Sequence, residues 1–155
     1  MTKENNAPMA ATLQEMLLAP DTKPQVTADC MKLIDQEVAA KSGVSGTAVK
    51  LAYKTASTLA SGYLQSMVES LIPDMAGQLQ PYWAGFAASG AAGFGDYLAK
   101  RGDEVAEALL SVTDARAQTS TRPTILKAYR AVRGGASRHV IAALPNLGAL
   151  IQKYA

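Results

Sequence analysis

The chain has 155 residues, a formal net charge of +2 and a single cysteine. That length suits one domain, and a lone cysteine excludes an intramolecular disulfide and a zinc site built from cysteines. The charge is unevenly distributed, because all 13 acidic residues precede residue 115 while seven of the 15 basic residues follow it. We therefore expect the C-terminal part to attract anionic surfaces such as nucleic acid, acidic lipid or an acidic protein.

The sequence predicts a cytoplasmic protein without a membrane span. Its N-terminus lacks the basic start and long apolar run of a secretion signal. The longest uncharged run, residues 75–95, contains five glycines and falls short of the hydrophobicity of a bilayer span. We expect residues 1–9 to form a flexible terminus and residues 10–155 to form a single helical domain.

Helical periodicity dominates the chain and predicts an all-α fold, a compact bundle of about six to eight helices. The first predicted helix follows the apolar stripe of residues 26–38 and stops at Gly43. The second is a long helix over residues 47–72 that Pro73 ends. It is expected to be straight unless Gly62 bends it.

Beyond that helix the pattern breaks. Residues 74–95 contain prolines and glycines at short intervals, which favour tight turns or close contacts between helices. Asp103 and Glu104 then open a predicted helix that ends near Arg116, because acids suit the positive end of the helix dipole and bases the negative end.

The basic C-terminal part predicts three further helices. The segment TSTRP begins a helix over residues 125–132, which Gly134 stops. A shorter helix follows and meets Pro145, and Asn146 is placed to cap a last helix.

Two pairs of segments resemble each other within the chain. AVKLAYK at residues 48–54 is similar to TILKAYR at 124–130, and IPDMAGQLQPY at 72–82 is similar to LPNLGALIQKY at 144–154. The pairs occur in the same order at nearly the same separation, as two related helical halves would produce. Chance recurrence of Ala, Leu and Tyr in helical phase is the alternative.

The segment EVAAKSGVSGTAVKLAY, residues 37–53, resembles the helix-turn-helix of the lac-repressor class of regulators. In that resemblance Gly43 makes the turn with a positive φ. The residues that would contact DNA are Ser45, Thr47 and Lys50 in the major groove and Lys54 near a phosphate. An ordinary tight turn between two helices of a bundle is the other interpretation of the same pattern.

A larger part of the chain is similar to a small bacterial all-helical family that is uncharacterised. The segments that carry this resemblance are KSGVSGTAVKLAY, FGDYLAKRGDEVAEALLSVTDARA and KAYRAVRGGASRHVIAALPNLGAL. The resemblance implies a helical fold but no activity, ligand or site.

The sequence offers little for catalysis, so we expect no enzyme. The only histidine, His139, has no acid near it in sequence to orient it, and Cys30 lies on the apolar stripe of its helix. Asp103, Glu104 and Glu107 are expected at the solvent-exposed first turns of a helix, and their spacing is not that of metal ligands. Neither a metal nor a cofactor is expected.

The residues that we expect to bind a partner are basic. Lys127, Arg130 and Arg133 recur every three residues on one predicted helical face, and the candidate set also includes Arg122 and Arg138. A solvated helix face is the alternative interpretation. We predict a non-enzymatic protein-interaction module whose partner is another protein or an acidic surface. DNA binding through residues 37–53 is the alternative function. The sequence is also compatible with a homo-oligomer.

Overall fold

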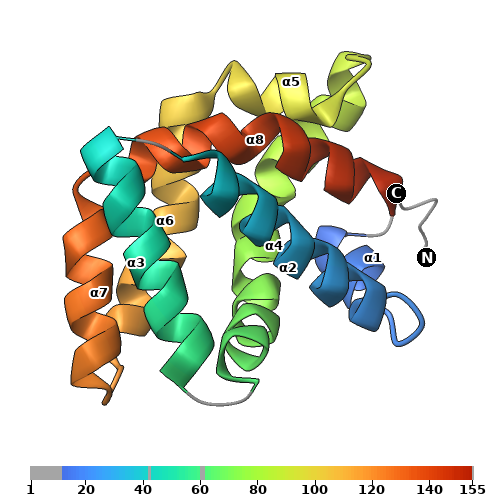
Figure 1. Ribbon diagram of the computed structural model, residues 1–155. Coiled ribbons are helices and arrows are strands. Elements are labelled where there is room, and N and C mark those ends of the chain that lie inside the picture. Colours follow the sequence, from blue (N-terminus) through green and yellow to red (C-terminus); the bar gives the residue numbers. More distant parts are fainter. Residues whose placement is uncertain (1–11, 42, 60–61, 155) are drawn as a thin grey trace.

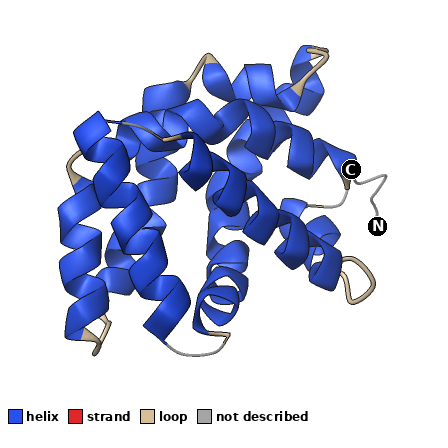
Figure 2. Ribbon diagram, in the orientation of Figure 1, coloured by secondary structure: helices blue, strands red, loops and turns tan. Residues whose placement is uncertain are grey.

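Eight helices make up the part of the chain that the structure describes, a computed structural model of residues 12–41, 43–59 and 62–154 (Figure 1). They are α1 (Leu13–Leu18), α2 (Lys23–Ala40), α3 (Gly43–Leu59), α4 (Tyr63–Ser89), α5 (Phe94–Ala99), α6 (Gly102–Gln118), α7 (Pro123–Arg133) and α8 (Ala136–Lys153). These ranges contain no strand (Figure 2). The predicted all-α bundle is confirmed, whereas the predicted flexible terminus at residues 1–9 lies outside the described residues.

The helices enclose one apolar core. In Figure 1, α3 and α7 run side by side on the left, α5 lies along α8 at the top, and α2 crosses in front of α4. The largest fully buried side chains are Phe94, Leu13, Leu98, Leu144, Val26 and Val105. Because these residues come from both ends of the sequence, the core depends on packing between distant segments.

The predicted long helix over residues 47–72 is wrong, because α3 ends at Leu59 and a new helix begins at Tyr63. Gly62 precedes α4 with a φ of 76°, a left-handed conformation that glycine adopts without steric cost. Pro73 does not end a helix either. It lies inside α4, which continues to Ser89.

The helix continues past Pro73 because tertiary packing outweighs the local penalty. A proline inside a helix costs about 3 kcal/mol. Buried Leu71 and Ile72 precede Pro73, and buried Ala76 and Leu79 follow it. Full burial of one large aliphatic side chain contributes about 1.5 to 3 kcal/mol, so the residues on the two sides together exceed the cost of the proline. The predicted break over residues 74–95 is therefore wrong up to Ser89.

The same correction applies to Pro145, which lies inside the continuous helix α8. Leu144 before it is 0% exposed and Ile151 after it is 3% exposed, so the helix buries residues on both sides of the proline. Asn146 caps no helix; its Nδ2 atom donates a hydrogen bond to Glu37 Oε2 at 3.0 Å.

The turn between α2 and α3 also differs from the expectation. Lys41, which follows α2, is extended with φ −74° and ψ 150°, and among the described residues a positive φ is found at Gly62 and Gly90, not at Gly43. Gly43 is the first residue of α3 instead of a stop signal. The predicted bounds of the helices that became α6 and α7 hold, although the N-cap residue of α7, Arg122, makes no side-chain capping bond.

The two halves of the chain, α1 to α4 and α5 to α8, repeat their long-range hydrogen bonds. The backbone N–H of Leu13, at the start of α1, donates to Gln80 Oε1 in α4 at 2.7 Å. At the start of α5, the N–H of Phe94 donates to Gln152 Oε1 in α8 at 2.9 Å. Gln80 and Gln152 occupy the same position in the two similar segments that contain the prolines.

A second repeated bond joins a tyrosine to an aspartate. Tyr53 Oη in α3 donates to Asp35 Oδ1 in α2 at 2.7 Å, and Tyr129 Oη in α7 donates to Asp114 Oδ1 in α6 at 2.5 Å. These tyrosines match in the other pair of similar segments. The repeated bonds support a relation between the two halves.

Candidate functional site

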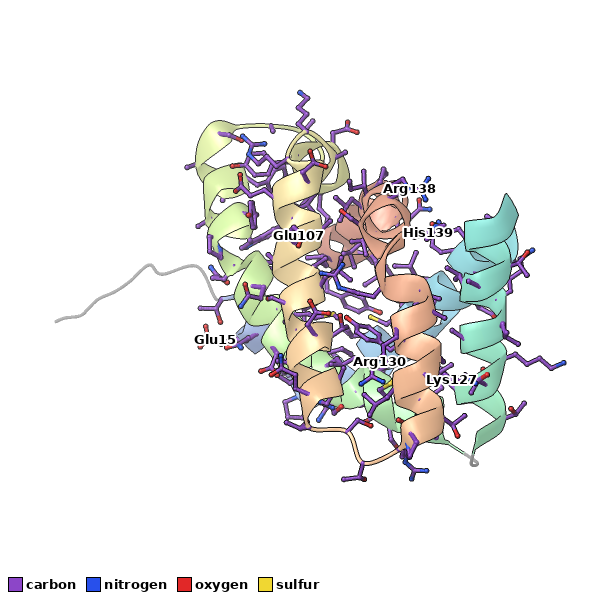
Figure 3. All side chains as sticks on the ribbon, turned by 90° about the vertical axis from the view of Figure 1, so that its left-hand side faces the viewer. Glu15, Glu107, Lys127, Arg130, Arg138 and His139 are labelled. Atoms are coloured by element: carbon purple, nitrogen blue, oxygen red, sulfur yellow. The ribbon has the colours of Figure 1, made fainter. Side chains whose placement is uncertain are left out.

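Exposed basic side chains gather on the adjacent helices α3 and α7 and at the start of α8. We call this surface the basic face, and its residues are Lys50, Lys54, Lys127, Arg130 and Arg138, all exposed. Figure 3 shows Lys127 and Arg130 on α7 with Arg138 above them. Neither α3 nor α7 contains an acidic residue. The basic face therefore carries positive charge without a carboxylate on the helices that form most of it.

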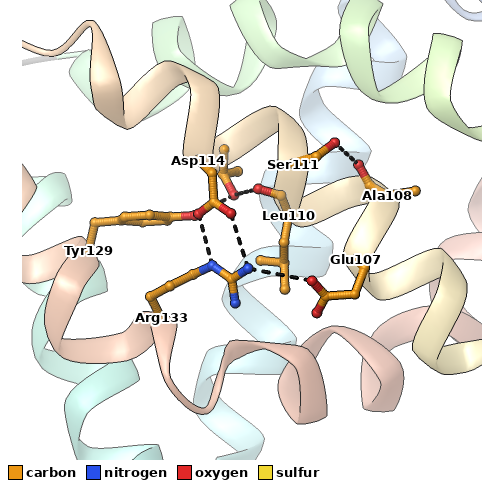
Figure 4. A network of polar contacts seen from close by, with 8 residues as sticks. Glu107, Ala108, Leu110, Ser111, Asp114, Tyr129 and Arg133 are labelled. Carbon is orange, nitrogen blue, oxygen red and sulfur yellow. Dashed lines mark hydrogen bonds and ion pairs between the residues drawn. The ribbon is translucent and has the colours of Figure 1, made fainter.

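Arg133 does not contribute to this face, although it lies on the same helix. Its Nε and Nη2 atoms donate to the two carboxylate oxygens of Asp114 at 2.8 and 3.0 Å, and Nη2 lies 3.7 Å from Glu107 Oε1 (Figure 4). The hydrogen bond from Arg133, followed by that from Tyr129, lowers the pKa of Asp114. The charge of Arg133 is thus balanced within the monomer by acids of α6.

A pocket of about 440 Å³ lies between the start of α4, the end of α6 and helix α7. Its wall is largely apolar or aromatic, and those residues are Tyr63, Met67, Leu71, Ala117, Ile125, Leu126 and Tyr129. Six serine and threonine side chains and two arginines, Arg116 and Arg122, complete the lining. The described residues that line the pocket include no acid.

Both arginines of the pocket are held in place by neutral groups. The guanidinium of Arg116 donates to the hydroxyl of Ser70 and, at 3.2 Å, to its carbonyl oxygen. Arg122 is exposed, and its guanidinium carbon lies 4.8 Å from the centroid of the Tyr63 ring. Because hydroxyl, carbonyl and ring partners leave the positive charge uncompensated, the pocket is electropositive.

Tyr129 forms one wall of the pocket and is fixed by the network in Figure 4. Besides Asp114, its hydroxyl contacts Thr113 Oγ1 at 2.8 Å. Burial, followed by the bond to Asp114, raises the pKa of Tyr129. The hydroxyl therefore stays protonated at neutral pH, and the ring has a fixed position.

Sequence reasoning missed this pocket. It interpreted Arg116 as a partner of the helix dipole and placed Tyr63 and Met67 within the predicted helix over residues 47–72. No local sequence pattern indicates the pocket, because residues that form it, such as Arg116 and Ser70, lie 46 positions apart in the chain.

The residues that catalysis would need are poorly activated. Burial raises the pKa of the Cys30 thiol to about 11, so a thiolate is scarce at neutral pH. Burial, then Lys41 and Arg138, lower the pKa of His139, which favours a neutral imidazole. Within the described ranges no group of three or more potential metal ligands comes together, and none of the helices is long and apolar enough to cross a membrane.

The residues expected to contact DNA lie on α3. Thr47, Lys50 and Lys54 are exposed, and the side chain of Ser45 lies outside the described residues. Helix α3 has 17 residues and packs along α7. It is therefore longer than a typical recognition helix and has a neighbour beside it.

A family model described as "Family of unknown function (DUF6918)" matches residues 13–155. The chain therefore belongs to this uncharacterised family, as the sequence predicted. No curated protein and no solved structure matches the sequence. The bacterial origin and the resemblance to the lac-repressor class stay predictions.

Proposed function

We propose that this chain is a non-enzymatic interaction module that binds an acidic surface of another protein through its basic face. The observation that carries the proposal is the placement of four exposed cations on two adjacent helices that lack acids: Lys50, Lys54, Lys127 and Arg130. Ordinary surfaces mix both signs of charge.

Leu51 favours a protein partner. It is 65% exposed and lies between Lys50 and Lys54 on α3. Protein interfaces combine an apolar centre with a polar rim, whereas a phosphate backbone offers no partner to an exposed leucine. Burial of a leucine contributes about 1.5 to 3 kcal/mol, which exceeds the contribution of about 0 to 1 kcal/mol from one exposed ion pair. The cations would accelerate and orient the encounter, and Leu51 would anchor it.

The test compares two anionic probes by fluorescence anisotropy at low and physiological salt: an acidic peptide with leucines between glutamates, and a DNA duplex. We expect the peptide to bind, binding to weaken with salt, and Lys127→Gln with Arg130→Gln to remove most of it. Leu51→Ser should weaken peptide binding at both salt concentrations, because the apolar term is not screened.

A matched control changes the same amount of charge elsewhere. Lys23→Gln with Lys100→Gln removes two exposed cations, one at the start of α2 and one at the end of α5, and should leave binding intact. Absence of peptide binding at low salt, or equal losses in the two double variants, would overturn the proposal.

DNA binding through residues 37–53 is the second candidate, and the exposure of Thr47, Lys50 and Lys54 favours it. Tighter binding to the duplex than to the peptide would support DNA binding. The slope of the logarithm of the binding constant against the logarithm of the salt concentration should then steepen by about 0.9 for each phosphate neutralised. In that case Thr47→Ala should relax sequence preference, and Lys54→Gln should lower the slope.

A further inference from the structure

The pocket between α4, α6 and α7 combines an apolar interior with positive charge at its edge. Its volume of about 440 Å³ lies within the range of pockets that hold small organic molecules, about 300 to 1,000 Å³. Such pockets are mainly apolar and use a few polar groups to orient the ligand. Arg116 and Arg122 are the charged groups placed to do so here.

Both guanidinium groups keep donors for a ligand. An arginine has five N–H donors, and the described contacts of Arg116 use its two terminal nitrogens on one residue, Ser70. Arg122 contacts the Tyr63 ring with its guanidinium carbon 4.8 Å from the ring centroid, and no hydrogen bond among the described residues uses its side-chain N–H groups. A carboxylate or phosphate matches these donors in charge, and each can accept two parallel N–H bonds from one arginine.

The positions of the first half that correspond to these arginines hold other residues. Arg116 follows Asp114 by two residues, and in the first half Glu37 follows the matching Asp35 by two residues. Glu37 forms an ion pair with Lys41 at 3.5 Å and accepts a hydrogen bond from Asn146. The first half therefore has a self-paired acid where the second half has an arginine without an acid partner in the described residues.

The other arginine has no basic counterpart either. Arg122 precedes Tyr129 by seven residues, and Gly46 precedes the matching Tyr53 by seven. A Cβ atom on Gly46 would lie 2.9 Å from the carbonyl carbon of Lys41, so the first half is packed closely at this position. The two arginines are thus particular to the half that contains the pocket.

We infer that this pocket binds a small amphipathic anion, a molecule with an apolar chain or ring that lies against Met67, Leu71 and Leu126 and an oxyanion headgroup held by Arg116 and Arg122. The shared chemistry is an oxyanion on an apolar body, and the headgroup is a carboxylate or a phosphate. The site is separate from the basic face, since Lys127 and Arg130 do not line it.

The experiment measures binding of decanoate, decyl phosphate and the neutral decanamide to the full chain by isothermal titration calorimetry, below the micellar concentration of each probe. We expect at least one anion to bind saturably. The affinity of the amide should be lower by about tenfold or more, because a hydrogen bond to a charged group contributes more free energy than a neutral one by about that factor. Tighter binding of one anion identifies the headgroup. Equal binding of the amide, or saturable binding of no probe, would overturn the inference.

Three variants locate the ligand. Arg116→Gln and Arg122→Gln should each weaken binding of the anion by about tenfold and leave the amide nearly unchanged. Ala117→Phe should remove binding of all probes, because the ring would fill the pocket. Losses that are equal for anion and amide in the arginine variants would contradict recognition of the headgroup.

Arg101 offers a matched control, because it makes the same kinds of contact away from the pocket. Its guanidinium carbon lies 3.8 Å from the Tyr97 ring centroid, and Nη1 donates to the Tyr97 carbonyl at 2.9 Å. Arg101→Gln and the pair Lys127→Gln with Arg130→Gln should leave anion binding unchanged. A loss in either control as large as in Arg116→Gln would mean that overall charge, and not this pocket, attracts the anion.

Discussion

Substitution of Gly148 by alanine should destabilise the protein more than any other glycine-to-alanine change in its long helices. A Cβ atom at Gly148 would lie 2.3 Å from both the Cα and the N atom of Gly95 and 2.7 Å from the carbonyl carbon of Phe94. All three are backbone atoms of α5, so no rotamer change relieves the clash. Helix α5 must move away from α8 by about 1 Å to restore ordinary contacts.

The cost follows from what α5 buries. Phe94 and Leu98 are both 0% exposed, and a shift of their backbone disturbs both side chains. Overpacking of a closely packed core costs about 1 to 3 kcal/mol, and a gain of up to about 1 kcal/mol from alanine's helix propensity opposes it. We expect a net loss of about 1 to 3 kcal/mol, because the clash is with backbone and the partial loss of packing at two core residues adds to it.

The assay is urea unfolding followed by the fluorescence of the only tryptophan, Trp83. Its ring centroid lies 5.0 Å from that of Phe94, so the native spectrum also reports a displacement of α5. A loss of about 1 to 3 kcal/mol corresponds to a fall in melting temperature of about 2 to 12 °C for a chain of this size.

Gly77 supplies the matched control, because it lies in α4 after Pro73 as Gly148 lies in α8 after Pro145. A Cβ atom there would meet only the side-chain nitrogen of Gln14, at 3.2 Å, which can move. Gly77→Ala should be neutral or stabilise the protein by up to about 1 kcal/mol. The reasoning is refuted if Gly148→Ala is as stable as the wild type and keeps its native fluorescence.

Three further predictions concern other parts of the molecule. Cys30 should react with iodoacetamide at pH 8 far more slowly in the folded protein than in urea, because its pKa is raised to about 11; equal rates would contradict the burial of the thiol. Asp114→Asn should lower stability at neutral pH. The folded-state pKa of Asp114 lies below its ordinary value, so its stabilisation is present above the unfolded pKa and disappears as the pH falls through the folded one; a stability difference that persists in strong acid would contradict the pairing with Arg133. Gln80→Leu and Gln152→Leu should each cost about 1 to 3 kcal/mol by leaving a backbone N–H without its acceptor, and a neutral effect of both would argue against the repeated bond.

The sequence predicted the helices whose start and end signals agree with their burial. Asp103 and Glu104 begin α6 and Arg116 lies in its last turn, as the dipole favours. Pro123 is the first residue of α7, and Gly134 follows its last residue. In these segments the local preference and the tertiary packing indicate the same structure, so a local signal is sufficient.

Prediction failed where packing opposes the local signal. Pro73 and Pro145 are strong helix breakers, yet α4 and α8 continue past them because residues on both sides of each proline are buried. Which side chains will be buried depends on contacts with segments far along the chain, and the local pattern does not contain that information.

The candidate site shows the same division between local and distant information. A helical spacing of three residues predicted one face for Lys127 and Arg130, and both are exposed on α7. Arg133 follows the same spacing but pairs with Asp114, 19 residues earlier. Charge patterning along a helix therefore predicts which cations share a face. Only the structure shows which of these cations form ion pairs with acids of another helix.

The hydrogen bonds that α1 to α4 and α5 to α8 repeat lie within one continuous chain, and this connectivity affects how many sites the molecule can carry. A symmetric dimer of identical four-helix subunits would hold each side chain twice, so an arginine at the position of Arg116 would create two pockets and remove both copies of the acid. In one continuous chain the two positions vary independently. Glu37 pairs with Lys41 and Asn146 in one half while Arg116 lines a pocket in the other, so that a single chain carries an internal ion pair and a positively charged cavity at corresponding positions.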